Sequence, residues 1–445
     1  MFLSVYVGGF LLSLFSNPAI SFIVYQVLYF FNPSKRWWGS MIPDLSYSFY
    51  VSVLMIFCTF VVYSKQQVNN KLLAAPPFKW MYAFLVVFIL MTFTAVYPER
   101  HGAAIEHFTK LIITTSLAYK LIDTEKKLDW AFWGYLFGSW YISYLAWQVG
   151  RDWSGRVEGI GTVDSPDSNG IAAAIAPALV VAFYYFWVSK TWLRRGLFAI
   201  AGIFIANGLI LINSRGAFLG VAASLIMFML YMFFSSTQRK YQRSIAIILT
   251  VLGLSASWYL MDDAFIERMQ TIQSADLDEA AEKETGATRT FFWLAAIDVA
   301  KDHPLGSGAY GFQYFAPTYI PSDIAVSGVS KSVHSTWFEI LTETGFLGIT
   351  LYGLMLLSSL GAIRKCMATF KAKGDVENFY KMVMLQSALI AYLIAASFMD
   401  RSRAVVMFWL ILFSACAYNI YILKNQKTAV SSLAANSPST NSKLS

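Results

Sequence analysis

Three side chains suited to anion chemistry stand beside long apolar runs of the sequence. Arg215 lies in NSRG between two such runs, Arg289 lies in TRTFFWLAAIDVAKDHPLGSGAYGF, and His334 opens HSTWFEILTETGFLG. An arginine inside a bilayer costs roughly 2.5–3.5 kcal/mol, and the cost falls at the interface, where the side chain reaches water. A guanidinium can bind phosphate oxygens through two parallel hydrogen bonds. The three residues therefore indicate a site for an anionic lipid headgroup.

Each of these residues also has a structural interpretation. Arg215 fits an interfacial anchor, and His334 fits an interfacial residue at the mouth of a span. Glu339 and Glu343 follow His334 and could act as a base, pair with an arginine or cap a helix. Arg289 stands near the start of an amphipathic helix with one apolar face, formed by Phe292, Ala295, Ala296 and Val299.

The turn after this helix and one outer loop leave similar alternatives. His303 precedes a proline and is interpreted as a turn residue, while Gly306 and Gly308 are a weak phosphate-loop signal. In the loop from Gly150 to Asn169, aromatic and cationic side chains could stack on sugar rings or anchor the chain at the interface. They are Arg151, Trp153 and Arg156.

The composition places these residues in a membrane protein. The chain has 445 residues, of which 57% are hydrophobic and 13% charged, against roughly 25% charged residues in soluble proteins. Apolar runs long enough to cross a bilayer recur throughout. They predict an all-α polytopic integral membrane protein with about twelve to thirteen transmembrane helices, near 2–15, 17–31, 46–63, 79–96, 108–122, 130–147, 170–188, 196–213, 216–234, 244–261, 336–361, 382–399 and 404–423.

The distribution of lysine and arginine predicts the orientation. Five alternate loops, among them SKTWLRR and TQRKYQR, are short and basic, so they are expected in the cytoplasm. The net charge of +8 is explained by these loops, and membrane lipids rather than nucleic acid are the expected partners. The opposite loops face outward and include the longest one, which should contain short helices. The three scattered cysteines predict neither a disulfide framework nor a metal site.

The spans and loops divide the chain into five expected regions. An N-terminal transmembrane region covers 1–130 and a central one covers 131–261. The long outer loop covers 262–335, and a C-terminal transmembrane region covers 336–423. The last segment, 424–445, is rich in serine, asparagine and alanine and is expected to be a disordered cytoplasmic tail.

The NSRGA turn, the segment around Arg289 and HSTWFEILTETGFLG occur in an order and separation that resemble a known family. Over about residues 150–361 the chain resembles the O-antigen ligase and O-antigen polymerase superfamily of bacterial inner membranes, and SPDSNGIAAAIAPAL is similar to it as well. The N-terminal SNPAISFIVYQVLYFFNPSKRWWG is similar to that of putative O-glycosylation ligases of the superfamily, some of them linked to exosortase systems.

The resemblance implies a metal-independent glycosyltransferase without a cofactor, in the inner membrane, with its active site facing the periplasm. The donor would be a glycan on undecaprenyl pyrophosphate, and the acceptor would be lipid A-core, a protein or a growing glycan. The family's pyrophosphate-binding arginines match Arg215 and Arg289, and its histidine matches His334, which would act as a base or a phosphate ligand. Lys331 would add a phosphate contact.

Several functions fit this picture. Within the superfamily the chain could be a ligase onto lipid A-core, a protein O-glycosylation ligase or a polymerase, because no motif encodes the acceptor. A transporter of a lipid-linked glycan would instead require a continuous cationic cavity through the spans. A purely structural assembly subunit would give the arginines no purpose.

Overall fold

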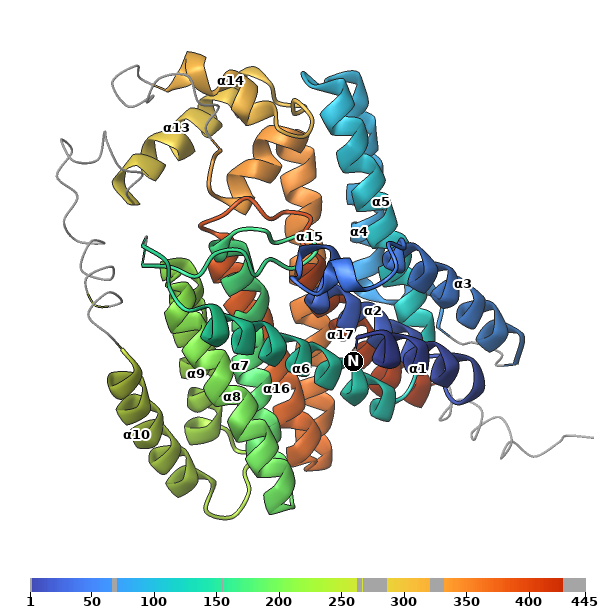
Figure 1. Ribbon diagram of the computed structural model, residues 1–445, viewed down its shortest axis with the longest axis vertical. Coiled ribbons are helices and arrows are strands. Elements are labelled where there is room, and N and C mark those ends of the chain that lie inside the picture. The colour runs from blue at the N-terminus through green and yellow to red at the C-terminus, as the bar shows by residue number, and fades with distance from the viewer. Residues whose placement is uncertain are drawn as a thin grey trace, which may run out of the picture.

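The computed structural model describes residues 2–65, 70–153, 155–261, 266, 286–320 and 332–426. Within these residues the chain forms helices and no strands (Figure 1). The helices are α1 (Phe2–Phe15), α2 (Ile20–Phe31), α3 (Tyr47–Lys65), α4 (Pro76–Leu90), α5 (Pro98–Leu121), α6 (Glu125–Val149), α7 (Ser168–Val188), α8 (Trp192–Ile212), α9 (Arg215–Phe234), α10 (Gln242–Leu260), α13 (Gly286–Asp302), α14 (Gly311–Tyr319), α15 (Thr336–Lys373), α16 (Val376–Ala396) and α17 (Val405–Tyr418).

The lengths and compositions of these helices confirm an all-α polytopic membrane protein. Each of the thirteen predicted spans coincides with a described helix. Seven of the described helices are long and apolar enough to cross a membrane, fewer than the twelve to thirteen expected from hydropathy. They are α4 with the short turn after it, α7, α8, α9, α15, α16 and α17 with its extension. The helices α1 and α2 have only 14 and 12 residues, and a bilayer requires about 20.

The seven helices divide into inner and outer members. The most apolar stretches of α7, α16 and α17 are 78%, 83% and 89% buried, whereas those of α4, α8, α9 and α15 are 33–39% buried. A helix that is apolar on every face is expected in the interior of a bundle. The sequence IAAAIAPAL of α7 also offers small side chains that let neighbouring helices approach closely. These three helices therefore form the centre against which the outer helices pack.

The helix α15 is broken by a kink that fixes the loop after α13. Its residue Gly345 has φ 64° and ψ −167°, which confirms the kink expected from ETGFLG. Beside the break, the amides of Ser307 and Gly308 donate to the carbonyls of Thr342 and Glu343, each at 3.0 Å. Backbone groups that lose helical partners at the kink are thus satisfied by the loop. The loop and the first turns of α15 consequently form one unit.

The helices α13 and α14 lie together at one end of the helical bundle, at the top of Figure 1. The first turns of α15 reach the same end, which we call the α13 end. The apolar face expected on α13 is confirmed, since Phe292, Ala295, Ala296 and Val299 are all buried. This face packs with α14 and α15 in a second, smaller hydrophobic cluster. The short helices expected within the long loop are therefore present in its described part.

The contact between α9 and α16 gives a test of the packing. A Cβ atom on Gly220 of α9 would collide with the backbone carbonyl of Ala391 in α16. The Gly220→Ala variant should therefore lose about 1–3 kcal/mol of stability through overpacking. Thermal unfolding of the detergent-purified protein measures this loss. In the matched control Gly253→Ala, the new Cβ meets nothing within 4 Å, so an equal loss in both variants would contradict the packing.

Candidate functional site

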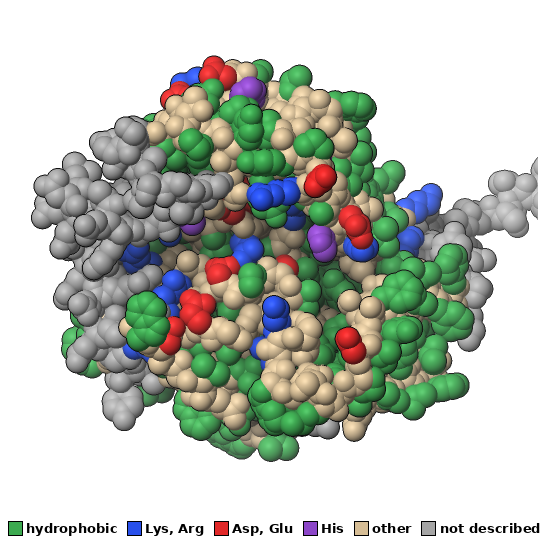
Figure 2. All heavy atoms as spheres, turned by 45° about the horizontal axis from the view of Figure 1, so that its top comes forward, with side chains coloured by type: hydrophobic (Ala, Val, Ile, Leu, Met, Phe, Trp, Pro, Cys, Tyr) green, Lys and Arg blue, Asp and Glu red, His purple; other side chains and the backbone are tan. Residues whose placement is uncertain are grey.

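A cavity of about 540 Å³ lies at the α13 end, between α15 and the loops that precede α7 and α17. In Figure 2 charged and histidine side chains gather in a hollow across the middle of this face, with apolar surface around them. The cavity is lined by Asp164, Asp167, Asn169, Tyr310, Phe312, Gln313, Ser332, Val333, His334, Glu339, Thr342, Glu343, Phe398, Met399, Asp400, Arg401, Ser402, Arg403 and Ala404.

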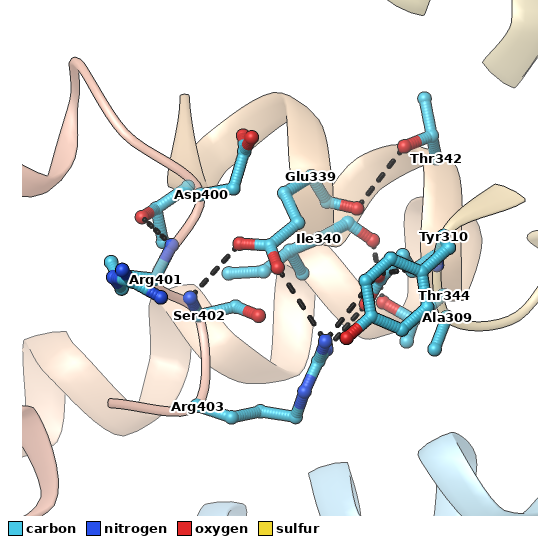
Figure 3. Close-up of polar contacts among 12 residues, drawn as sticks. Ala309, Tyr310, Glu339, Ile340, Thr342, Thr344, Asp400, Arg401, Ser402 and Arg403 are labelled. Atoms are coloured by element: carbon cyan, nitrogen blue, oxygen red, sulfur yellow. Dashed lines mark hydrogen bonds and ion pairs between the residues drawn. The ribbon is translucent and has the colours of Figure 1, made fainter. Parts of the chain in front are cut away.

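One wall of the cavity is a buried ion cluster around Arg403 (Figure 3). The Arg403 guanidinium pairs with Glu343, and its Nη2 lies 3.5 Å from Oε1 of Glu339. The same carboxylates accept backbone N–H groups, Glu343 from Tyr310 and Glu339 from Ser402, each at 2.9 Å. Burial alone would lower the pKa of Arg403, but the two carboxylates raise it above its usual value. Of the roles left open for the two glutamates, the structure supports pairing with an arginine.

A second ion pair joins the loop after α16 to the start of α7. Arg401 pairs with Asp167, whose Oδ1 also caps α7 by accepting the amide of Gly170 at 2.9 Å. A Cβ atom at position 170 would lie 2.8 Å from Nη2 of Arg401, so any other residue there would require the guanidinium to shift. Nearby, Asp164 accepts the amide of Val405 at 2.7 Å, at the start of α17. This ion pair and this hydrogen bond thus connect the loops before α7 and α17.

His334 lines the cavity on a constrained backbone. Its φ is 52°, a left-handed conformation that is uncommon for a residue other than glycine. The carboxylate of Asp400 accepts the amide of the next residue, Ser335, at 3.0 Å. Burial raises the pKa of Asp400, while His334 and the backbone N–H groups act in the opposite direction. On the other side, the His334 ring lies 6.3 Å from the ring of Phe292 in α13.

Of the two arginines expected to hold phosphate, Arg289 contacts Phe398, which lines the cavity, and Arg215 belongs to a turn that lies against the same residue. Arg289 donates from Nη1 to the Phe398 carbonyl at 3.3 Å. Arg215 is the first residue of α9, and a Cβ atom on the adjacent Gly216 would lie 3.0 Å from Cδ2 of Phe398. The side chain of Arg215 makes no hydrogen bond or ion pair within the part of the chain that the structure describes. We call Arg215, Arg289 and Phe398 the cationic edge of the cavity.

Asn169 holds the turn before Arg215 in place. Its Oδ1 accepts hydrogen bonds from the Ser214 hydroxyl at 2.9 Å and from Nη2 of Arg156 at 2.8 Å. Ser214 therefore does not cap the N-terminus of α9 with its side chain. The position of Arg215 is set by this contact with the start of α7.

The cationic residues of the outer loop before α7 have a structural role that the sequence did not reveal. Arg151 donates from Nη2 to the carbonyl of Ile210 at 2.8 Å, and Arg156 donates from Nε to that of Ile212 at 3.4 Å. These carbonyls belong to the last turn of α8, where a cation is favoured by the helix dipole. Both arginines thus cap a helix, while Trp153 is 98% exposed.

The glycine-rich turn after α13 binds protein carbonyls and not an anion. Gly306 and Gly308 adopt φ values of 93° and 75°. Their amides donate to the carbonyls of His303 and Glu343 at 2.9 and 3.0 Å. His303 stacks on Phe315 with ring centroids 4.2 Å apart, in agreement with its interpretation as a turn residue.

The structure brings three of the four expected site residues to one short stretch, residues 398–400. His334 lines the cavity, Arg289 donates to the carbonyl of Phe398 at its edge, and the turn that carries Arg215 lies against Phe398 through Gly216. Lys331 lies outside the described residues. Sequence reasoning missed Arg401 and Arg403, although three charges in DRSR between the last two apolar runs were an available signal. The chemical roles of all these residues remain predictions.

Residues 200–353 match the family model described as O-Antigen ligase. This part of the chain, which is less than half of it, is similar to an O-antigen ligase domain. This domain contains Arg215, Arg289 and His334, and it confirms the resemblance to the O-antigen ligase superfamily. It supports a membrane glycan-processing function of the ligase or polymerase type, with a lipid-linked glycan and an acceptor as substrates in general. The likeness of the N-terminal region to putative O-glycosylation ligases stays a prediction.

Two further comparisons accompany the O-antigen ligase match. A chain of a solved structure titled "Structural coordination of polymerization and crosslinking by a peptidoglycan synthase complex" has 16% identity and a TM-score of 0.41. The match covers 78% of this chain and 96% of that chain. A search of curated proteins found no match.

The ion cluster can be tested by removing one charge at a time. The Arg403→Met variant leaves two buried carboxylates uncompensated and should lose about 3–5 kcal/mol of stability. Adding Glu343→Gln should recover part of this loss, because it removes one of the uncompensated charges. Chemical or thermal unfolding in detergent measures both steps. As a control, Glu106→Gln removes the ion pair with Lys110, whose side chains are 64–66% exposed, and should change stability little. Equal losses of stability in Arg403→Met and Glu106→Gln would refute a buried cluster.

Proposed function

We propose that this protein is an inner-membrane glycosyltransferase that moves a glycan from undecaprenyl pyrophosphate to an acceptor hydroxyl at the periplasmic face. It would be an O-antigen ligase or a protein O-glycosylation ligase, and a polysaccharide polymerase is the alternative. The proposal places the α13 end of the bundle in the periplasm, as the distribution of basic loops predicts.

The observation that carries the proposal is the meeting of Arg289, His334 and the Arg215 turn around residues 398–400, beside a polar cavity. The three residues come from three distant parts of the O-antigen ligase domain. Arg215 begins an apolar helix, so its guanidinium stands where a lipid-linked pyrophosphate has its charged group. Among the residues that the structure describes, Arg215 has no counter-ion, so its guanidinium is available to a substrate.

In the proposed reaction the acceptor hydroxyl attacks the anomeric carbon of the first donor sugar. A new carbon–oxygen bond forms, the bond to the pyrophosphate breaks, and its electron pair leaves with undecaprenyl pyrophosphate. One direct displacement of this kind inverts the anomeric configuration. The guanidinium groups of Arg215 and Arg289 would stabilise the negative charge that develops on the leaving group. His334 would take the acceptor proton or bind phosphate as an imidazolium.

Deletion of the gene in its native host tests the function and separates the candidates. Surface polysaccharide is compared on gels, and secreted glycoproteins are compared by intact mass. Loss of long polysaccharide chains with unchanged protein masses supports a ligase or polymerase of surface polysaccharide. Loss of a discrete glycan mass from a protein supports a protein O-glycosylation ligase. If neither changes, the glycosyltransferase proposal fails, and transport of a lipid-linked glycan becomes the better explanation.

Replacing either arginine of the cationic edge should slow transfer. The Arg215→Ala and Arg289→Ala variants are each expected to lose about 10²–10³ in rate, the usual cost of removing one group that stabilises developing charge. Transfer from the host's lipid-linked glycan by purified protein measures the loss. Arg194→Ala is the matched control, because this arginine is exposed in the first turn of α8, within the basic segment SKTWLRR expected in the cytoplasm. A full rate in Arg215→Ala would contradict the pyrophosphate contact.

A pH–rate profile distinguishes the two roles of His334. A general base acts only after losing its proton, so the wild-type rate would rise with pH across the range in which a histidine titrates. A cationic phosphate ligand acts only while protonated, so the rate would fall across the same range. The His334→Ala variant should lose whichever limb the wild type shows. An unchanged profile in this variant would exclude both roles.

A further inference from the structure

We propose that Tyr97, Tyr310 and Tyr314 form a platform on which the sugar rings of a saccharide acceptor stack. This inference rests on the proposed function and narrows it, because it makes the acceptor a glycan and not a protein side chain. The platform lies beside the cavity and shares Tyr310 with it.

The rings of Tyr310 and Tyr314 are exposed, and that of Tyr97 beside them is half-buried. Tyr310 and Tyr314 are 42% and 52% exposed, and they lie one helical turn apart at the start of α14. The ring of Tyr97, just before α5, meets the ring of Tyr314 edge to face, with centroids 5.5 Å apart. The guanidinium of Arg100 lies 5.0 Å from the centroid of Tyr97 and 6.0 Å from that of Tyr310. Four side chains from two separate segments thus form one surface.

The backbone beneath the rings is held rigidly. The amide of Tyr310 donates to Glu343 at 2.9 Å, and the amide of Ala309 donates to Nδ1 of His101 at 3.0 Å. The carbonyl of Ser307 accepts the amide of Val96 at 3.1 Å, which links the two segments that supply the rings. A rigid tyrosine loses little conformational entropy when a ligand binds. The platform is therefore ready to bind before a ligand arrives.

Sugar is the ligand that fits such a surface. One face of a sugar ring exposes C–H groups and stacks on an aromatic ring, while the hydroxyl groups at the ring edge require polar partners. Arg100 and Gln313 provide polar groups beside the rings, and Gln313 lines the cavity. Tyrosines also anchor proteins at membrane interfaces. However, the first turn of α5 carries the exposed charged residues Glu99 and Arg100 directly after Tyr97, which favours a surface in contact with water.

The position of the platform assigns it to the acceptor. The cationic edge meets the loop after α16 at Phe398, whereas Tyr310 meets the other end of this loop through Glu343 and Arg403. Figure 3 shows Asp400 and Tyr310 at opposite ends of the polar network, with Glu339 between them. In an inverting displacement the nucleophile attacks from the side opposite the leaving group. A pyrophosphate at the cationic edge therefore places the acceptor on the side of Tyr310.

The test uses lipid A-core purified from the native host as acceptor and the host's lipid-linked glycan as donor. For Tyr314→Ala the KM for lipid A-core should rise about tenfold, as expected for the loss of one stacking contact. Its kcat and its KM for the donor should stay unchanged, and Tyr314→Phe should behave as wild type. The control Tyr241→Ala removes a tyrosine that is 69% exposed in the turn before α10, and its KM for lipid A-core should equal that of the wild type.

Each other outcome overturns part of the argument. An unchanged KM for lipid A-core in Tyr314→Ala, with an active wild type, refutes the platform alone. A raised KM for the donor in Tyr314→Ala would mean that the rings bind the donor and not the acceptor. If the wild type glycosylates a host protein and not lipid A-core, the glycan acceptor is refuted while the glycosyltransferase proposal stands. If the wild type transfers to no acceptor, the proposed function itself fails. In that case binding of delipidated core oligosaccharide, followed by NMR saturation transfer, still tests the platform, and equal binding by wild type and Tyr314→Ala refutes it.

Discussion

The arrangement of the cavity depends on the burial of two carboxylates one helical turn apart on α15. Glu339 and Glu343 stand four residues apart, and like charges at this spacing repel each other on a helix. Arg403 lies between them and offsets this repulsion. The carboxylates also accept backbone N–H groups from the loops on either side. A single charge cluster thereby positions α15, the loop before α17 and the start of α14.

The kink at Gly345 extends this coupling to the loop between α13 and α14. Because the helical hydrogen bonds are interrupted there, the carbonyls of Thr342 and Glu343 are available to the loop after α13. Glu343 thus contributes its carboxylate to the ion cluster and its carbonyl to the loop. A displacement of this loop would disturb both contacts together. The tyrosines of the proposed platform and the ion cluster are consequently held by the same few residues.

The sequence predicts local features of this protein better than its long-range contacts. Hydropathy and periodicity located the helices, the apolar face of α13 and the kink, because each depends on a pattern within one segment. The pairing of Glu343 with Arg403 joins positions 60 residues apart, and no periodicity encodes it. The same holds for Arg151 and Arg156, whose acceptors lie in the last turn of α8. The sequence therefore identifies a charged residue of an outer loop as a candidate for a structural or functional role. The residue that it pairs with can be identified only in the folded structure.

The separation of charge around the cavity also constrains where an anionic substrate could bind. The carboxylates of Asp167, Glu339 and Glu343 are all engaged by Arg401 or Arg403. This internal pairing leaves those two arginines with little capacity for a further anion. A pyrophosphate entering the cavity would meet this carboxylate-rich wall, whereas at the cationic edge it would meet Arg215, which has no counter-ion among the described residues. Charge alone thus favours the leaving group at Phe398 and keeps the opposite wall for a neutral hydroxyl group.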